Sequence, residues 1–134
     1  MSTRTTLDAL RLELRRGTLV LAVLAALRVE RYGYTLRGTL AGHGVDIDEG
    51  ALYPMLRRLE AQGLLHSEWR ETDGRRKRFY RLSSAGQDTL VALEGEWSDL
   101  NASLRRLLKG GTRDGQARSI SEESVARAAA RRPR

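Results

Sequence analysis

Four consecutive cations, Arg75, Arg76, Lys77 and Arg78, follow directly after an Asp73-Gly74 pair. Asp-Gly is a strong signal for a two-residue hairpin turn, because glycine tolerates positive φ. Adjacent like charges repel one another and add nothing evident to folding. Clustered cations at a hairpin tip are suited to holding phosphate groups. An ordinary solvated loop is the alternative interpretation.

A second group of candidate residues lies on a helix predicted from about Asp48 to Gln62 and ended by Gly63. If the leucines of this helix face inward, the helical period places small and basic residues on the opposite side. Small residues allow close approach to a nucleic-acid groove, where an arginine can reach guanine edges or phosphates. The alternative is the solvated face of an ordinary amphipathic helix. The candidate contact residues are Gly50, Tyr53, Pro54, Arg57 and Arg58.

Pro54 requires its own explanation, because proline inside a helix removes a hydrogen bond and clashes with the preceding turn. The helix could begin near Gly50, which would place Pro54 about one turn in. It could instead bend at the proline. Both alternatives are compatible with the sequence.

Composition and missing motifs narrow the class of function. The chain has 134 residues, no cysteine, two histidines and a formal charge of +7, which suits a single domain with an anionic partner. Cysteine-ligated zinc and thiol catalysis are excluded, and no nucleophile-elbow, phosphate-loop or complete dinucleotide motif occurs. No apolar run reaches the roughly 18 residues of a membrane span. We therefore expect a cytoplasmic protein that is not an enzyme, has no membrane partner and carries no cofactor or metal.

The predicted elements would place the two basic groups in one domain. Apolar spacing predicts helices over residues 6–16 and 18–29, a short helix through Leu36 and Leu40, and the helix at 48–62. The hairpin follows. This order predicts a mainly α fold with a small β-hairpin, in which residues 1–83 form a winged helix-turn-helix domain.

The last predicted helix carries an apolar stripe that one chain would leave uncovered. Ser84 and Gln87 have capping-box spacing at its start. Apolar residues then alternate three- and four-residue steps over more than two heptads. We therefore expect residues 84–108 to be a dimerisation helix, reinforced by leucines of the first helix. The predicted homodimer residues are Leu7, Leu10, Leu14, Leu90, Leu93, Trp97, Leu100, Leu104 and Leu107.

Residues 109–134 differ in composition from the rest of the chain. They contain seven basic and three acidic residues and almost no large apolar side chain except Ile120 and Val125. Such a segment buries too little to order itself, so we expect a disordered basic tail. A short helix capped by Ser121 is the alternative.

Three segments together resemble the PadR family of transcriptional regulators. The first is Tyr32-Gly33-Tyr34, and the third is Arg76-Lys77 followed by Tyr80-Arg81-Leu82-Ser83. The second, Gly50 to Leu65, contains Gly-Ala-Leu-Tyr-Pro and Arg-Leu-Glu-Ala-Gln-Gly-Leu, and is the most specific. The resemblance covers about Leu14 to Leu108, and the short last helix resembles the smaller subgroup of the family.

The resemblance implies a dimeric winged-helix repressor that binds a pseudo-palindromic operator in double-stranded DNA and responds to a small aromatic or drug-like effector. It implies DNA contact by Tyr53, Arg57 and residues 76–78. Trp97 then has two interpretations, as plain dimer core or as the lining of an effector pocket. A winged-helix module that binds protein or RNA without operator specificity is the alternative function.

Overall fold

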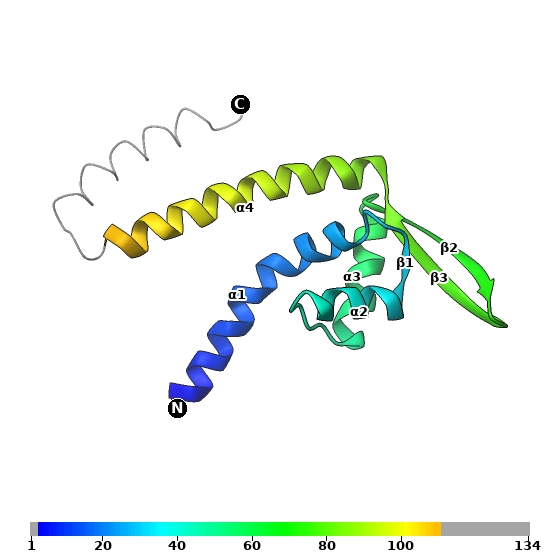
Figure 1. The fold of residues 1–134 in the computed structure, drawn as a ribbon, viewed down its shortest axis with the longest axis horizontal. Coiled ribbons are helices and arrows are strands. Elements are labelled where there is room, and N and C mark those ends of the chain that lie inside the picture. The colour runs from blue at the N-terminus through cyan, green and yellow to red at the C-terminus, as the bar shows by residue number, and fades with distance from the viewer. Residues whose placement is uncertain (1–2, 111–134) are drawn as a thin grey trace. The chain divides into compact units, whose positions relative to one another are not determined.

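Helices dominate the structure, a computed structural model that describes residues 3–110. The chain divides into two compact units within its last helix, one ending at Glu94 and the other beginning at Gly95. None of the described helices combines the length and apolar character needed to cross a membrane. The elements, in chain order, are α1 (Thr3–Ala26), β1 (Arg31–Tyr32), α2 (Gly33–Gly42), α3 (Glu49–Ala61), β2 (Leu65–Thr72), β3 (Arg75–Leu82) and α4 (Ser84–Gly110) (Figure 1).

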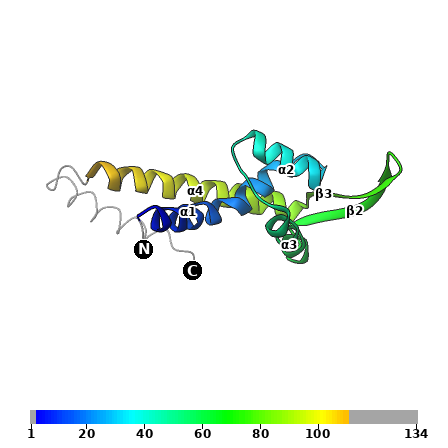
Figure 2. The same ribbon diagram turned by 90° about the horizontal axis from the view of Figure 1, so that it is seen from below.

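The three strands form one antiparallel sheet in the order β1-β3-β2. Strands β2 and β3 make the predicted hairpin, which we call the wing and which extends away from α2 and α3 (Figure 2). Its turn has positive φ at both central residues, 53° at Asp73 and 73° at Gly74, as a type I′ turn requires. Strand β1 was not predicted, because two residues paired to Phe79 and Tyr80 leave no periodic pattern to detect.

The hydrophobic core of the first unit joins helices α1, α2 and α3 to the base of the wing. It takes apolar side chains from the end of α1, from α2 and α3, and from the strand ends nearest the helices. The start of α4 adds one further leucine. The buried apolar residues are Val23, Leu24, Leu27, Leu36, Leu40, Leu52, Leu56, Leu59, Leu65, Tyr80, Leu82 and Leu90.

Helix α1 corrects the prediction of two separate helices at 6–16 and 18–29, because it is continuous through Gly17 and ends at Ala26. A glycine in a helix interior costs about 1 kcal/mol relative to alanine. Strong helix formers on both sides of Gly17 offset that cost, and no proline lies nearby.

The start of α4 is fixed by Ser83, which corrects the prediction that Ser84 caps this helix. The Ser83 hydroxyl accepts a hydrogen bond from the Gly86 amide at 2.9 Å and donates one to the Gly63 carbonyl at 2.6 Å. A Cβ at Gly86 would overlap the carbonyl oxygen of Leu64. The junction of the wing with α4 therefore requires glycine at this position.

Helix α4 also runs past the predicted boundary at Leu108 and includes Lys109 and Gly110. Most of the predicted basic tail, residues 111–134, lies outside the described residues.

The predicted dimer residues fall into two groups. Leu90 is a core residue, 6% exposed, and Leu93 is partly buried against the same core. This corrects the expectation that both lie on an uncovered stripe, since the first turns of α4 pack on their own unit. The remaining predicted residues are exposed in the single chain: Leu7, Leu10, Leu14, Trp97, Leu100, Leu104 and Leu107.

Candidate nucleic-acid interface

Helix α3 begins at Glu49, because Asp48 caps it. The Asp48 carboxylate accepts a hydrogen bond from the Ala51 amide at 2.8 Å, which satisfies one of the free donors of the first turn. Glu49 adds a negative charge where the helix dipole favours one. The start near Gly50 therefore agrees with the first of the two alternatives for Pro54, which is the sixth residue of α3.

The two sides of α3 differ as the helical period predicts. Its three leucines, Leu52, Leu56 and Leu59, are at most 2% exposed. Gly50, Pro54, Arg57 and Arg58 lie exposed on other faces of the helix. No carboxylate within the described part of the chain pairs with Arg57 or Arg58. The exposed surface of α3 therefore combines residues without long side chains and two unpaired arginines.

Tyr53 is only partly exposed, unlike the other candidates on α3. Its ring occupies the space where a Cβ at Gly33 would lie, so Gly33 at the start of α2 makes room for it. Tyr53 therefore lies at the contact between α2 and α3, and it also packs against the core.

The cations nearest the wing turn have no acidic partner. Arg75 and Arg76 are exposed, and neither forms an ion pair within the described residues. The Arg76 guanidinium lies 5.1 Å from the centre of the Trp69 ring. Lys77 points to the other face of the strand, where its ammonium lies 4.4 Å from the centre of the Tyr32 ring. The wing tip therefore presents two unpaired guanidinium groups.

Arg78 differs from its neighbours because it is paired inside the protein. Its Nη2 donates to Glu60 Oε1 at 2.8 Å, and its Nε donates to Ser67 Oγ at 2.9 Å. The Ser67 hydroxyl in turn donates to the other oxygen of Glu60. We call these three residues the wing-base network. Arg78 was predicted as one of four equivalent cations, and the pairing with Glu60 and Ser67 was missed.

Arg70 forms a second set of ion pairs at the opposite face of the wing. Two of its guanidinium nitrogens donate to Glu30, at 2.5 and 2.9 Å, and Glu68 is a further acceptor. The hydrogen bond from Arg70 lowers the pKa of Glu30, and the same bond raises the pKa of Arg70. Arg70 and Arg78 are thus neutralised, whereas Arg75 and Arg76 are not.

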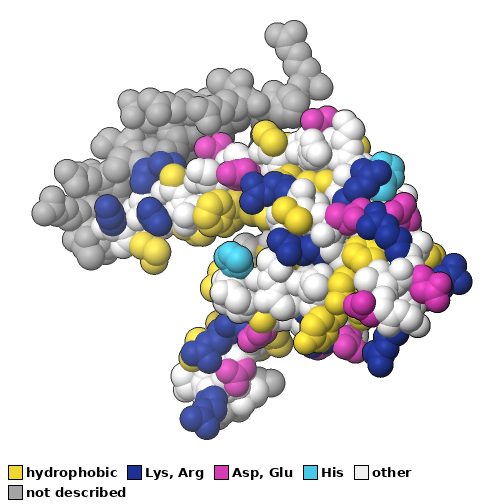
Figure 3. All heavy atoms as spheres, turned by 45° about the vertical axis from the view of Figure 1, so that its right-hand side comes forward, with side chains coloured by type: hydrophobic (Ala, Val, Ile, Leu, Met, Phe, Trp, Pro, Cys, Tyr) yellow, Lys and Arg dark blue, Asp and Glu magenta, His cyan; other side chains and the backbone are white. Residues whose placement is uncertain are grey.

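Both basic and acidic side chains are visible where the wing comes forward (Figure 3). Glu68, one of the two partners of Arg70, lies on β2. On β3, Arg75 and Arg76 at the tip and Arg81 near the base are exposed and form no ion pair within the described residues. Tyr80, on the β3 strand of the wing, is buried, and burial raises the pKa of its phenol. It joins the wing to the core.

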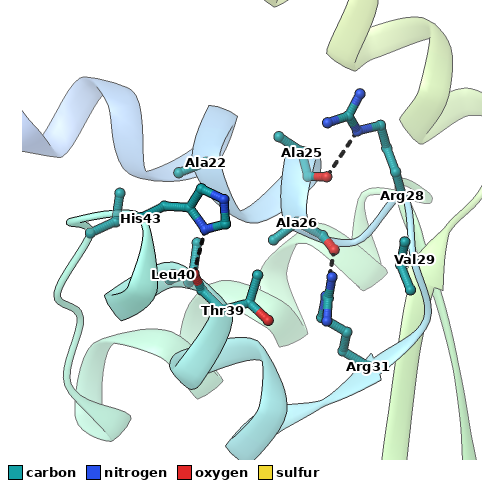
Figure 4. Close-up of a pocket in the computed structure, with 10 residues that line it drawn as sticks. Ala22, Ala25, Ala26, Arg28, Val29, Arg31, Thr39, Leu40 and His43 are labelled. Carbon is teal, nitrogen blue, oxygen red and sulfur yellow. Dashed lines mark hydrogen bonds between the residues drawn. The ribbon is translucent and has the colours of Figure 1, made fainter.

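A pocket of about 500 Å³ lies elsewhere in the same unit, between the end of α1 and α2 (Figure 4). Arg28 and Arg31 border it, and their Nε atoms donate to the last carbonyls of α1, at Ala25 and Ala26. The His43 ring borders it too and is hydrogen-bonded to the Thr39 carbonyl. None of the residues predicted to bind DNA or effector lines this pocket.

Three helices around one core, with an exposed basic third helix and a β-hairpin tipped by arginines, define the class of winged helix-turn-helix proteins. Residues 20–92 match the family model described as "Transcriptional regulator PadR-like family". The chain therefore belongs to the PadR-like family of transcriptional regulators. The predicted family and fold are confirmed.

Individual relatives agree with this assignment. Over 62 residues the chain is 48% identical to "Transcriptional regulator Rv3488" of Mycobacterium tuberculosis, a match that covers 46% of this chain and 58% of that protein. The matched segment thus spans less than two thirds of the relative.

Solved structures match over a greater share of their length. A PadR family transcriptional regulator from Eggerthella lenta is 43% identical with a TM-score of 0.74, and the match covers 78% of this chain and 94% of that one. A PadR-like transcriptional regulator from Bacillus cereus is 26% identical with a TM-score of 0.66, covering 73% of this chain and 98% of that one.

Proposed function

We propose that this regulator is a cytoplasmic repressor that binds a pseudo-palindromic DNA operator as a homodimer. The observation that supports it most is the placement of unpaired arginines on two neighbouring elements, Arg57 and Arg58 on α3 and Arg75 and Arg76 at the wing tip. Exposed guanidinium groups without acidic partners are suited to bind a polyanion.

In this proposal α3 enters the major groove. Gly50 and Pro54 have no long side chain and allow the helix to approach the bases closely. Arg57, on the same exposed surface, reads a guanine through its O6 and N7 atoms. Arg58 and the partly exposed Tyr53 hold the flanking backbone.

The wing tip supplies phosphate contacts in this proposal. Arg75 and Arg76 bind the backbone beside the groove that α3 occupies, and Lys77 supports them. Such contacts hold the protein on any sequence, so base preference comes from α3. Arg78 is not among these phosphate contacts, because its guanidinium already binds Glu60 and Ser67.

A second copy of the chain completes the proposed assembly. The domain of residues 1–83 reads one half-site, and the helix beginning at residue 84 dimerises. Support comes from the exposed apolar side chains of α4, among them Trp97 at 47% and Leu104 at 45% exposed. A symmetric dimer binds two half-sites about one helical turn apart. Trp97 would also offer an aromatic surface to a small aromatic effector that releases the DNA.

Selection of random duplexes by the purified protein, followed by sequencing, tests the proposal. We expect two inverted half-sites, and binding of the selected duplex about 10³-fold or more tighter than a scrambled one. Light scattering should give twice the mass of the chain. Equal affinity for every duplex, or a preference for single strands, would instead favour the protein- or RNA-binding alternative.

A further inference from the structure

We infer that Glu60 is a positioning residue that sets the wing against α3 through Arg78 and Ser67, and this inference rests on the proposed DNA-binding function. Its carboxylate lies at the end of α3 and holds both strands of the wing at once. No other described carboxylate joins α3 to the wing. Within the described residues, the side-chain hydrogen bonds between the two elements proposed to contact DNA thus all converge on Glu60.

The geometry of the wing-base network leaves little freedom. Both carboxylate oxygens of Glu60 accept hydrogen bonds, one from Arg78 and one from Ser67. Arg78 also bonds Ser67, so the three side chains close a ring of hydrogen bonds. The Arg78 guanidinium lies 5.6 Å from the Trp69 ring centre and 5.7 Å from that of Tyr80. Charge-assisted bonds of this kind restrict orientation as well as distance.

The network is made of near neighbours of the residues proposed to contact DNA. Glu60 is three residues after Arg57, which is the spacing of side-chain neighbours on a helix. Arg78 is two residues after Arg76, and alternate residues of a strand share one face. In this inference, a change in the network alters the position of Arg76 relative to Arg57. The side chains of Arg78 and Glu60 are 35% and 29% exposed, so the pair is partly buried, and the folding of each variant is checked by circular dichroism.

The direction in which DNA affinity changes when Glu60 is neutralised distinguishes a positioning role from a purely electrostatic one. Removing the negative charge of Glu60 near a polyanion should strengthen DNA binding if charge alone matters. A positioning role predicts weaker operator binding instead, because the wing tip and α3 no longer engage one duplex together. These opposite expectations make Glu60→Gln the informative substitution.

The experiment measures the affinity of Glu60→Gln, Arg78→Gln and the double variant for the selected operator and for a scrambled duplex, at several salt concentrations. Glu71→Gln is the matched control, because Glu71 is exposed on the same face of the wing, opposite Arg76. We expect each network variant to lower the ratio of operator to scrambled affinity about tenfold, the scale of coupling between contacting groups. The double variant should be no worse than either single one, and Glu71→Gln should leave the ratio unchanged.

Either of two outcomes with the glutamine variants would overturn the inference. One is a Glu60→Gln variant that behaves like Glu71→Gln. The other is an Arg78→Gln variant that weakens both duplexes equally and lowers the salt slope by about 0.9, as a lost phosphate contact does. If a glutamine variant unfolds, the same affinities are measured for Ser67→Ala, because this substitution removes only the hydroxyl that bonds Glu60 and Arg78. We expect a roughly threefold lower ratio from that lost hydrogen bond, and an unchanged ratio overturns the inference.

Failure of the proposed DNA-binding function can be distinguished from failure of the role inferred for Glu60. If the wild-type protein shows no preference among duplexes, operator binding itself is wrong. If the wild type selects an operator and the network variants keep its preference, only the role of Glu60 is wrong.

Discussion

Helices α3 and α4 both carry a leucine stripe at helical spacing, yet only one of them buries it within the chain. The α3 leucines are at most 2% exposed, whereas from Trp97 onward the α4 stripe is exposed, with Leu100 at 60%. The exposed side of α3 instead carries small residues and arginines. Periodicity therefore identifies an apolar face but not what covers it. The chemistry left exposed is the basis of the two proposed partners, an anion for α3 and another apolar surface for α4.

The largest effect should come from placing charge on the exposed stripe of α4. Leu100→Glu combined with Leu104→Glu should give monomers in light scattering, because two carboxylates cannot be buried unpaired in an apolar interface. Operator affinity should fall about 10²-fold or more as the two half-sites lose their linkage. Leu108→Glu is the control, since Leu108 is exposed and off the stripe. An unchanged dimer in the double variant would remove α4 from the interface.

Substitutions in the buried leucine stripe of α3 should lower the stability of the fold. Leu56→Ala should lower the free energy of unfolding by about 2–5 kcal/mol, because it removes apolar contacts and leaves a cavity. Leu12→Ala, on an exposed side chain of α1, should change it by about 0.5 kcal/mol or less. Urea unfolding followed by circular dichroism measures both. Equal losses for the two variants would contradict the contrast between buried and exposed leucines.

Local sequence signals predicted the parts of this comparison that depend on neighbouring residues. The Asp73-Gly74 turn was predicted, and so was the start of α3 at about Asp48. The exposed positions of Gly50, Pro54 and Arg57 also agree with the helical period. In each case the spacing along the chain determines the geometry.

Features that depend on distant residues were not predictable. Glu60 and Arg78 are 18 residues apart, and no local pattern distinguishes Arg78 from the cations beside it. Leu90 follows the same periodicity as the exposed leucines of α4, but it contributes to the core. Whether the exposed leucines contact a second copy stays a prediction.

On the exposed side of α3, Arg57→Ala should reduce operator affinity by about 1–3 kcal/mol and relax preference at one base pair, the expected effect of losing a bidentate guanine contact. Competition binding against operators changed one base pair at a time measures this. Arg28→Ala, at an exposed arginine beside the α1–α2 pocket, is the control. Intact preference at every position would show that Arg57 does not read a base.

The smallest effect should be at the wing tip. Arg76→Ala should weaken binding to all duplexes alike and lower the salt slope by about 0.9, because one phosphate contact is lost. Arg81→Ala, on an exposed residue at the base of β3, should leave the slope unchanged. Filter binding at four salt concentrations measures both. A change in base preference for Arg76→Ala would assign it to the base edges instead.

The length of the wing determines which charges of the protein act electrostatically on the arginines at its tip. Strands β2 and β3 have eight residues each, which corresponds to about 26 Å from the helical core to the turn. At physiological ionic strength the Debye length is about 8 Å, so roughly three screening lengths separate the turn from the far end of the wing. Arg75 and Arg76 are therefore largely screened from the charges of α1 and α2, whereas Glu60 and Glu30 lie closer to the tip because they bind Arg78 and Arg70 on the wing. Charge substitutions on α1 or α2 can accumulate without altering how the tip attracts an anion.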